Sequence, residues 1–253
     1  MPFYPPNIDE FAFLFDVDGT LADIAPTPDD VRISHGLRRN LERLSHVAKG
    51  AVALVSGRSL GSLDALFEPL ELTAIGGHGA EMRLLDNGHV EHVTEPPLAD
   101  LLRQRFTAIA ALDPKKIIVE DKEYSVAIHY RLARDKERAI LDAVAAICSE
   151  IDRNAVEVLH GKAVVEIKKS GFNKGTAIRA LMAHPPFAGR RPIFIGDDIT
   201  DEDAFAVMPE FNGIAISVGR MVKGVTLRFE APSDVRRWVE RISQADDRRP
   251  ADH

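Results

Sequence analysis

The sequence predicts an α/β protein, with a doubly wound parallel sheet of the Rossmann-like kind and a smaller α+β domain inserted into it. Short, continuous apolar runs at residues 11–15, 51–55 and 193–195 are typical of strands that are buried on both faces. Amphipathic helical patterns accompany these runs, and the order strand, helix, strand indicates a parallel sheet. In the middle of the chain, short strand-like runs are joined by tight polar turns, which favours an antiparallel sheet there.

Both ends of the chain contribute to the parallel sheet. After the strand at residues 11–15, Leu37, Leu41 and Leu44 recur behind Ser34, which predicts an amphipathic helix with Ser34 as its N-cap. The strand at residues 51–55 follows. The same alternation returns late in the chain, with helices expected near residues 174–182, from about 201 and at 233–243, and strands at 193–195 and 213–218.

The middle of the chain predicts an inserted domain of order α-β-β-α-β-β. A helical pattern runs to about residue 112, and a second one covers residues 135–149. Strands are expected at residues 116–120, 124–131, 155–159 and 163–168. We place the inserted domain at residues 96–168, beginning at Pro96, and the surrounding domain at residues 1–95 and 169–253.

Composition excludes several classes of protein. The 253 residues are 45% hydrophobic and carry 32 basic against 39 acidic side chains, a formal charge of −7, which is typical of a globular domain and not of a disordered chain. An acidic chain without a basic run is not expected to bind nucleic acid. Cys148 is the single cysteine, and no apolar stretch approaches the ~20 residues of a membrane span, so we expect a cytoplasmic protein without a membrane partner. A monomer is compatible with these features.

Polar clusters follow three of the predicted strands. Asp16 and Asp18 follow the first, Ser56 the second and Asp197 the third. Because the carboxyl ends of parallel strands meet at one edge of a sheet, where ligands collect, we expect these clusters to converge. So much negative charge in one place is unfavourable unless a carboxyl takes up a proton or a cation binds. Carboxylates without Cys or His nearby suit Mg²⁺ better than Zn²⁺, so Mg²⁺ is the predicted cofactor.

A phosphate site is predicted beside the carboxylates. Lys174 stands at the expected start of a helix, where the helix dipole makes a cation unfavourable unless an anion is close. Amide donors of the helix N-terminus, the Ser56 hydroxyl and the Lys174 charge together suit a phosphoryl group.

These motifs, in their order along the chain, resemble those of the haloacid dehalogenase superfamily of phosphatases. The elements that carry the resemblance are Asp16-Val17-Asp18-Gly19-Thr20-Leu21, Ser56, Lys174, and Gly196-Asp197-Asp198 followed by Asp201. Further motifs are similar to those of trehalose-6-phosphate phosphatases: Ser56-Gly57-Arg58, Gly77-His78-Gly79-Ala80-Glu81, His129-Tyr130-Arg131, and Glu166 ahead of Lys174-Gly175. The segment at residues 168–172 departs from the family because it has no proline.

The resemblance implies a hydrolase that uses Mg²⁺ to convert trehalose 6-phosphate and water to trehalose and phosphate. By this resemblance, Asp16 is the nucleophile that forms an aspartyl-phosphate, and Asp18 is the acid and base. Asp16, the Asp18 backbone carbonyl and Asp197 would hold Mg²⁺, with support from Asp198 and Asp201. The phosphoryl group would be bound by Ser56, Gly57 and Lys174.

The inserted domain is expected to select the sugar. Strand alternation places Ser125, Ala127, His129 and Arg131 on one face of their strand, and Glu166 and Lys168 on one face of theirs. A surface with both donors and acceptors suits a polyhydroxylated ligand. By resemblance, the residues that contact the sugar are Lys122, His129, Arg131, Glu166 and Lys168 from this domain and Arg58, His78 and Glu81 from the surrounding one.

Several of these motifs also have a purely structural interpretation. Asp201 and its neighbours are also typical of a helix N-terminus, Lys174 of a solvated side chain, and residues 56–58 of a plain turn. The polar faces of the inserted sheet are equally compatible with a solvent-exposed surface. A capped phosphatase acting on a sucrose or mannosyl phosphate, or a non-catalytic sensor of sugar phosphates, is the alternative function.

Overall fold

The computed structural model describes residues 4–85, 90–92, 98–152, 154–225 and 227–244. The chain divides into two compact units. The first comprises Met1–Ile24, Val31–His92 and Asn173–His253, and the second comprises Ala25–Asp30 and Val93–Phe172. The short segment Ala25–Asp30 therefore groups with the second unit, which its place in the sequence does not predict. The expected boundary at Pro96 lies outside the described residues.

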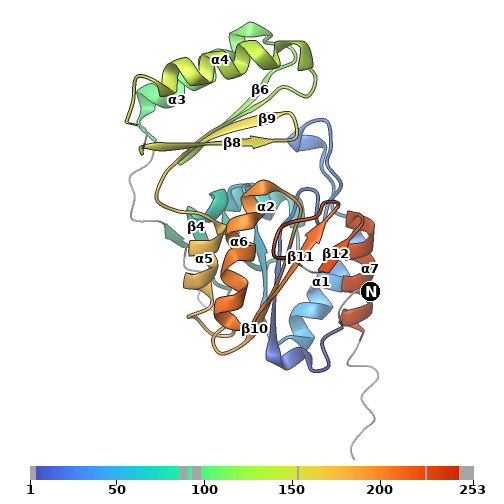
Figure 1. Ribbon diagram of the computed structural model, residues 1–253. Helices are drawn as coiled ribbons and strands as arrows, with labels where there is room; N and C mark the ends of the chain where they lie inside the picture. Colours follow the sequence, from blue (N-terminus) through green and yellow to red (C-terminus); the bar gives the residue numbers. More distant parts are fainter. Residues whose placement is uncertain (1–3, 86–89, 93–97, 153, 226, 245–253) are drawn as a thin grey trace, which may run out of the picture. The chain divides into compact units, whose positions relative to one another are not determined.

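The first unit is built on an eight-stranded sheet of order β12-β11-β10-β1-β2-β3-β4-β5 (Figure 1). Its strands are β1 (Phe11–Phe15), β2 (Val52–Val55), β3 (Thr73–Gly76), β4 (Glu81–Arg83), β5 (Val90–His92), β10 (Arg191–Gly196), β11 (Ile214–Val218) and β12 (Leu227–Phe229). The six strands from β12 to β3 are parallel, whereas β4 and β5 add an antiparallel edge. The predicted parallel sheet and α/β class are confirmed.

Helices cover both faces of this sheet (Figure 1). On one side α5 (Lys174–Leu181) packs against α6 (Glu202–Val207), and on the other α1 (His35–Val47) packs against α7 (Pro232–Ser243). A further helix, α2 (Leu60–Phe67), follows β2.

Strand β1 is fully buried between these layers. Phe13 and Phe15 pack against Trp238 of α7, with ring centroids 6.1 and 6.4 Å apart, whereas Ala12 and Leu14 belong to the apolar cluster that includes Ile178 and Leu181 of α5 and Ala204 of α6. This is why the strand is a continuous apolar run without alternation.

Side-chain caps mark the starts of α1 and α5, and the cap at Ser34 is the one that the sequence predicts. The Ser34 hydroxyl accepts a hydrogen bond from the amide of Leu37 at the start of α1. At the start of α5, Asn173 and Thr176 form a reciprocal capping box. The cap at Asn173 places Lys174 at the first position of its helix.

The second unit contains a four-stranded antiparallel sheet of order β6-β7-β9-β8. Its strands are β6 (Ile118–Lys122), β7 (Ser125–His129), β8 (Val156–Gly161) and β9 (Val164–Lys169). Helices α3 (Asp100–Thr107) and α4 (Glu137–Cys148) cover one face (Figure 1). The apolar cluster of this unit contains Val126, Ile128, Val165 and Ile167 from the strands with Ile140 and Val144 from α4.

The register of this sheet aligns the polar positions on its other face. Ser125 pairs with Lys168, and Ala127 pairs with Glu166. The two polar faces expected from strand alternation therefore coincide on one side of the sheet.

Short one-turn helices complete the described chain, at η1 (Ile8–Glu10), η2 (Pro28–Asp30), η3 (Gly77–Gly79), η4 (Ala108–Leu112), η5 (Arg134–Lys136), η6 (Ile199–Asp201) and η7 (Met208–Phe211). Within the residues described, every helix is too short or too polar to cross a bilayer.

Candidate functional site

Three buried carboxylates meet at the carboxyl edge of the parallel sheet. Asp16 directly follows β1, and Asp197 directly follows the neighbouring strand β10. Asp201 joins them from the one-turn helix η6. Carboxylate oxygens of Asp16, Asp197 and Asp201 lie within 4.8 Å of one another, and the three residues are 5%, 3% and 0% exposed. The edge of the sheet thus collects negative charge away from water.

Lys174 joins two of these carboxylates. Its Nζ lies 2.8 Å from Oδ1 of Asp16 and 2.7 Å from Oδ1 of Asp201, and the residue is buried. Burial would lower the pKa of the ammonium group, but its ion pairs with Asp16 and Asp201 outweigh burial and raise that pKa. The lysine therefore remains a positive charge inside the cluster.

Asp201 makes hydrogen bonds through both of its oxygens. Oδ1 accepts from Lys174, and Oδ2 accepts from the backbone amides of Asp197 and Asp198 at 2.8 and 2.9 Å. The Asp198 carboxylate accepts from the amide of Ile199 at the start of η6. Asp201 therefore links the backbone of the loop after β10 to the lysine.

The Asp18 side chain points to a different partner. Its two carboxylate oxygens accept from Nε and Nη2 of Arg58 at 2.6 and 2.8 Å, a bidentate ion pair. Gly19, at φ +88°, makes the turn behind it, and a Cβ at this position would lie 2.2 Å from Oδ2 of Asp197. Glycine is thus required where the turn after β1 approaches the carboxylates.

Ser56 and His78 lie close together at the ends of β2 and β3. The Ser56 hydroxyl accepts from the amide of Arg58 at 3.1 Å, and the amide of His78 donates to the Ser56 carbonyl. The His78 ring covers Gly57, where a Cβ would lie 2.3 Å from Nε2 of the ring. Glu81 forms a hydrogen bond to the backbone: its Oε2 accepts from the amide of Leu60 at the start of α2.

The polar face of the second unit has its own network. Oε1 of Glu166 accepts from the Ser125 hydroxyl at 2.6 Å and lies 3.3 Å from Nζ of Lys122. Nε2 of His129 lies 2.8 Å from Oε2 of Glu120. Glu120 is absent from the predicted site residues, although strand alternation along residues 118–122 places it on the same face as Lys122.

Two of the predicted sugar-binding residues, Lys168 and Arg131, donate hydrogen bonds to backbone carbonyls of their own unit. Lys168 is 2% exposed, and its Nζ donates to the carbonyls of Lys169 and Phe172 and lies 3.1 Å from Oε2 of Glu157. Nη2 of Arg131 donates to the carbonyl of Lys162. Both side chains thus hold the backbone around the sheet.

Comparison with known proteins places the whole arrangement in one family. The trehalose-phosphatase family model matches residues 14–233, which include the carboxylate cluster and the polar sheet. This chain belongs to the trehalose-phosphatase family. It is 38% identical to trehalose-6-phosphate phosphatase of Escherichia coli (strain K12) over 93% of this chain and 88% of the relative. It is 40% identical to a probable trehalose-phosphate phosphatase of Sinorhizobium fredii over 90% of this chain and 84% of the relative.

Solved structures agree in fold. The C-terminal domain of Candida albicans trehalose-6-phosphate phosphatase superposes with a TM-score of 0.80 at 22% identity, covering 93% of this chain and 92% of that one. A haloacid dehalogenase-like hydrolase from Bacteroides thetaiotaomicron gives a TM-score of 0.64 at 15% identity, over 92% of this chain and 99% of that one. These likenesses show the fold. The predicted resemblance to trehalose-6-phosphate phosphatases is confirmed by the family model and the relatives, so this chain is a phosphatase of a family that implies a sugar-phosphate substrate.

The carboxylate cluster of this chain suits a divalent cation. With Asp16, Asp197 and Asp201 ionised and Lys174 charged, the cluster has a net charge of −3 + 1 = −2, which one divalent ion would neutralise. The donor atoms are all carboxylate oxygens, the ligands that Mg²⁺ prefers. The residues present therefore fit Mg²⁺.

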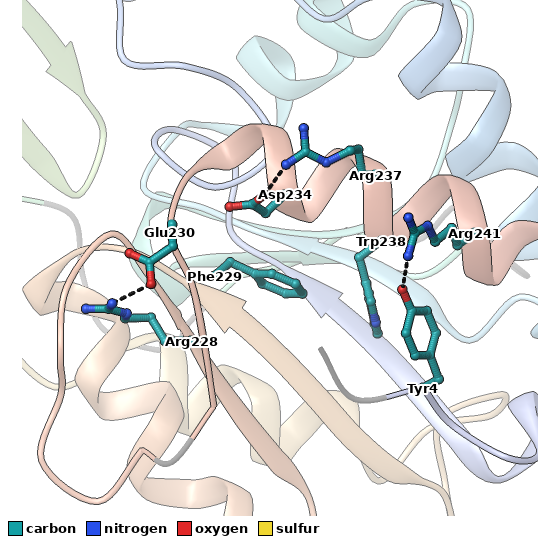
Figure 2. Close-up of a pocket in the computed structure, with 8 residues that line it drawn as sticks. All are labelled: Tyr4, Arg228, Phe229, Glu230, Asp234, Arg237, Trp238 and Arg241. Carbon is teal, nitrogen blue, oxygen red and sulfur yellow. Dashed lines mark hydrogen bonds and ion pairs between the residues drawn. The ribbon is translucent and has the colours of Figure 1, made fainter. Parts of the chain in front are cut away.

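A separate hollow of 310 Å³ lies beside β12 and α7, and none of the predicted site residues lines it (Figure 2). Its arginines point to partners within the wall: Arg228 to Glu230, Arg237 to Asp234, and Arg241 to the Tyr4 hydroxyl (Figure 2). The arginine side chains are held along the wall, and the hollow is not part of the carboxylate site.

Without metal, the protein is expected to lose stability as the pH rises because of Asp16. Burial raises the pKa of this carboxyl, as do Asp201 and Asp197, and Lys174 opposes them only in part. A carboxyl whose pKa is higher in the folded state stabilises the fold at low pH, and this contribution is lost as the pH rises through the folded pKa. Each unit of difference in pKa is worth about 1.4 kcal/mol.

Urea unfolding in EDTA, from about pH 5 to about pH 8, measures this effect. The free energy of unfolding should fall more steeply with pH for the wild type than for Asp16→Asn, which lacks the titrating group. Glu42→Gln, at an exposed position of α1, should follow the wild type. Parallel curves for the wild type and Asp16→Asn would contradict the raised pKa.

Proposed function

We propose that this chain hydrolyses trehalose 6-phosphate to trehalose and phosphate, with Mg²⁺ as its cofactor, through an aspartyl-phosphate intermediate. The observation that carries the proposal is the buried cluster of Asp16, Asp197, Asp201 and Lys174. It lies in a chain that is 38% identical to a trehalose-6-phosphate phosphatase.

The two units would have different roles in catalysis and in substrate selection. We assign the phosphatase chemistry to the surrounding domain, predicted from the sequence as residues 1–95 and 169–253, because the corresponding compact unit contains the carboxylates and Lys174. We assign sugar selection to the inserted cap domain, residues 96–168, because one face of its sheet presents Lys122, Ser125 and Glu166 together.

Asp16 would be the nucleophile. One of its carboxylate oxygens forms a bond to phosphorus as the bond between phosphorus and the sugar oxygen breaks, which leaves a phosphoryl group on Asp16. Lys174, already 2.8 Å from Oδ1, holds this carboxylate in place and offsets negative charge on the phosphoryl oxygens. Mg²⁺, held by Asp16, Asp197 and the Asp18 carbonyl, would neutralise further phosphoryl charge.

Asp18 would move the protons. It gives a proton to the sugar oxygen as that oxygen leaves, and then takes a proton from the water that attacks the aspartyl-phosphate, so that phosphate is released and Asp16 is restored. To act as the acid, Asp18 must carry a proton, so its carboxyl would exchange the bidentate ion pair with Arg58 for a hydrogen bond to the substrate.

Hydrogen-bond donors near the cluster would bind the phosphoryl oxygens. The Ser56 hydroxyl and the amide of Gly57 are the proposed donors from the loop after β2, together with Lys174. Asp198 and Asp201 would support this arrangement by fixing the loop after β10.

The sugar hydroxyls would be bound by hydrogen-bond donors and acceptors on basic and acidic side chains. In the cap domain, Lys122, His129 and Glu166 are the proposed direct contacts, whereas Lys168 and Arg131 would shape the surface through the backbone that they hold. In the core domain, Arg58 and His78 are the proposed contacts, with Glu81 placing the start of α2.

Substrate selectivity tests the proposed function directly. Phosphate release should be fastest on trehalose 6-phosphate with Mg²⁺ present. The kcat/KM values on sucrose 6-phosphate, mannosyl phosphate and glucose 6-phosphate should be at least about 10-fold lower. The reason is that a site built for hydroxyls rejects a ligand that leaves its polar groups unpaired. Comparable values on glucose 6-phosphate would contradict disaccharide specificity. Binding of trehalose 6-phosphate without turnover would favour a sensor.

Replacement of Asp16 tests the nucleophile. Asp16→Asn should abolish phosphate release, because an amide oxygen cannot form the aspartyl-phosphate, while circular dichroism shows the fold retained. Glu42→Gln should keep full activity. Any substantial turnover by Asp16→Asn would exclude Asp16 as the attacking group.

Replacement of Glu166 tests the role of the cap domain. Glu166→Gln should raise KM for trehalose 6-phosphate about 10-fold or more, the effect of losing a hydrogen bond to a charged group, with a smaller change in kcat. KM for p-nitrophenyl phosphate, which has no sugar, should not change. Asp142→Asn, at an exposed ion pair of α4, is the matched control. Equal effects of Glu166→Gln on both substrates would argue against sugar recognition.

A further inference from the structure

Arg220 makes two hydrogen bonds to the loop that presents Asp197 and a third to Glu202, the first residue of α6 (Glu202–Val207). The residue lies just beyond the end of β11. Its Nε donates to the backbone carbonyl of Asp197 at 2.8 Å, and its Nη2 donates to the backbone carbonyl of Asp198 and to Oε1 of Glu202, each at 2.8 Å. One planar guanidinium group thus contacts two successive carbonyls of the loop.

The same loop is held from its other side by Asp201. The peptide unit between Asp197 and Asp198 donates its N–H to Oδ2 of Asp201, and its carbonyl accepts from Nε of Arg220. Both polar ends of this peptide unit are therefore fixed by side chains. Neither a strand nor a helix does so, because β10 ends at Gly196 and η6 begins at Ile199.

We propose that Arg220 is a positioning residue that preorganises Asp197 for binding of a divalent cation. This inference rests on the proposed function, since it assigns Asp197 to the Mg²⁺ site. The direction of the Asp197 side chain follows from the orientation of its backbone, and Arg220 limits that orientation. Groups that hold a metal ligand in place contribute to metal affinity without touching the metal.

The hydrogen bonds to the carbonyls, and not the ion pair with Glu202, carry this role. The side chains of Arg220 and Glu202 are 35% and 46% exposed, and ion pairs at such exposure contribute little. The two carbonyls that Arg220 contacts belong to Asp197 itself and to its neighbour, so a change at Arg220 acts on the metal-binding loop directly.

Direct titration of the metal-free protein with Mn²⁺ by isothermal calorimetry tests the inference. Arg220→Gln should raise the Kd for Mn²⁺ about 10-fold, the lower end of the 10–100-fold range for residues that support a metal ligand. The concentration of Mg²⁺ that gives half-maximal activity should rise by a similar factor, while kcat at saturating Mg²⁺ stays close to that of the wild type. Arg220→Lys, which keeps the charge but not the planar fork, should give an intermediate Kd.

Two variants separate the carbonyl contacts from other effects. Glu202→Gln removes only the ion pair of Arg220, and Arg179→Gln removes an exposed arginine–carboxylate pair elsewhere in the same unit. Both should bind Mn²⁺ as the wild type does. Thermal unfolding in EDTA should give similar Tm values for all variants, which distinguishes a positioning role from a loss of fold.

Several results would overturn the inference. An unchanged Kd for Mn²⁺ in Arg220→Gln would contradict it, and so would a wild-type Kd in Arg220→Lys. An equal loss of Mn²⁺ affinity in Glu202→Gln would assign the effect to the ion pair instead. If Arg220→Gln does not fold, the Kd of Arg220→Lys decides. The proposed function fails separately, if the wild-type protein with bound Mg²⁺ releases no phosphate from trehalose 6-phosphate.

Discussion

The site depends on the buried ion pairs that Lys174 makes with Asp16 and Asp201. Lys174 and Asp16 are 158 residues apart in the sequence, on either side of the second unit, and the ammonium group joins them at 2.8 Å. Removing one partner of a buried ion pair leaves an uncompensated charge, which typically costs about 3–5 kcal/mol. The contact that closes the first unit across the insertion is therefore also the one that sets the charge of the carboxylate cluster.

The parts of this arrangement that follow from regular structure could be predicted from the sequence. Asp16 and Asp197 end strands that prove to be neighbours, so the rule that ligands collect at the carboxyl edge of a parallel sheet was sufficient to bring them together. The period of two along a strand likewise predicted which positions share a face within each strand, and the pairing of Ala127 with Glu166 brings the two polar faces to one side of the sheet. In both cases the backbone decides where the side chain goes.

Contacts that depend on a loop path or on the extension of a long side chain could not be predicted in this way. Arg58 donates to Asp18, and Lys168 donates to the carbonyl of Phe172. Both side chains are long and have several rotatable bonds, so their partners depend on which acceptors lie nearby in the folded chain. The antiparallel strands β4 and β5 were missed since each has only three residues, too few to show a period. Segment Ala25–Asp30 has no sequence feature that assigns it to the second unit.

The spacing of Asp197 and Asp201 gives the two carboxylates different roles within the cluster. Asp201 is the fourth residue after Asp197, and the turn of η6 brings the Asp201 carboxylate back to the amides at the start of its own loop. With Oδ2 accepting two amides and Oδ1 accepting Lys174, Asp201 has its bonding capacity largely used by the protein. A cation would thus draw mainly on Asp16 and Asp197, and Asp201 would act on it through the lysine and the loop that it orders.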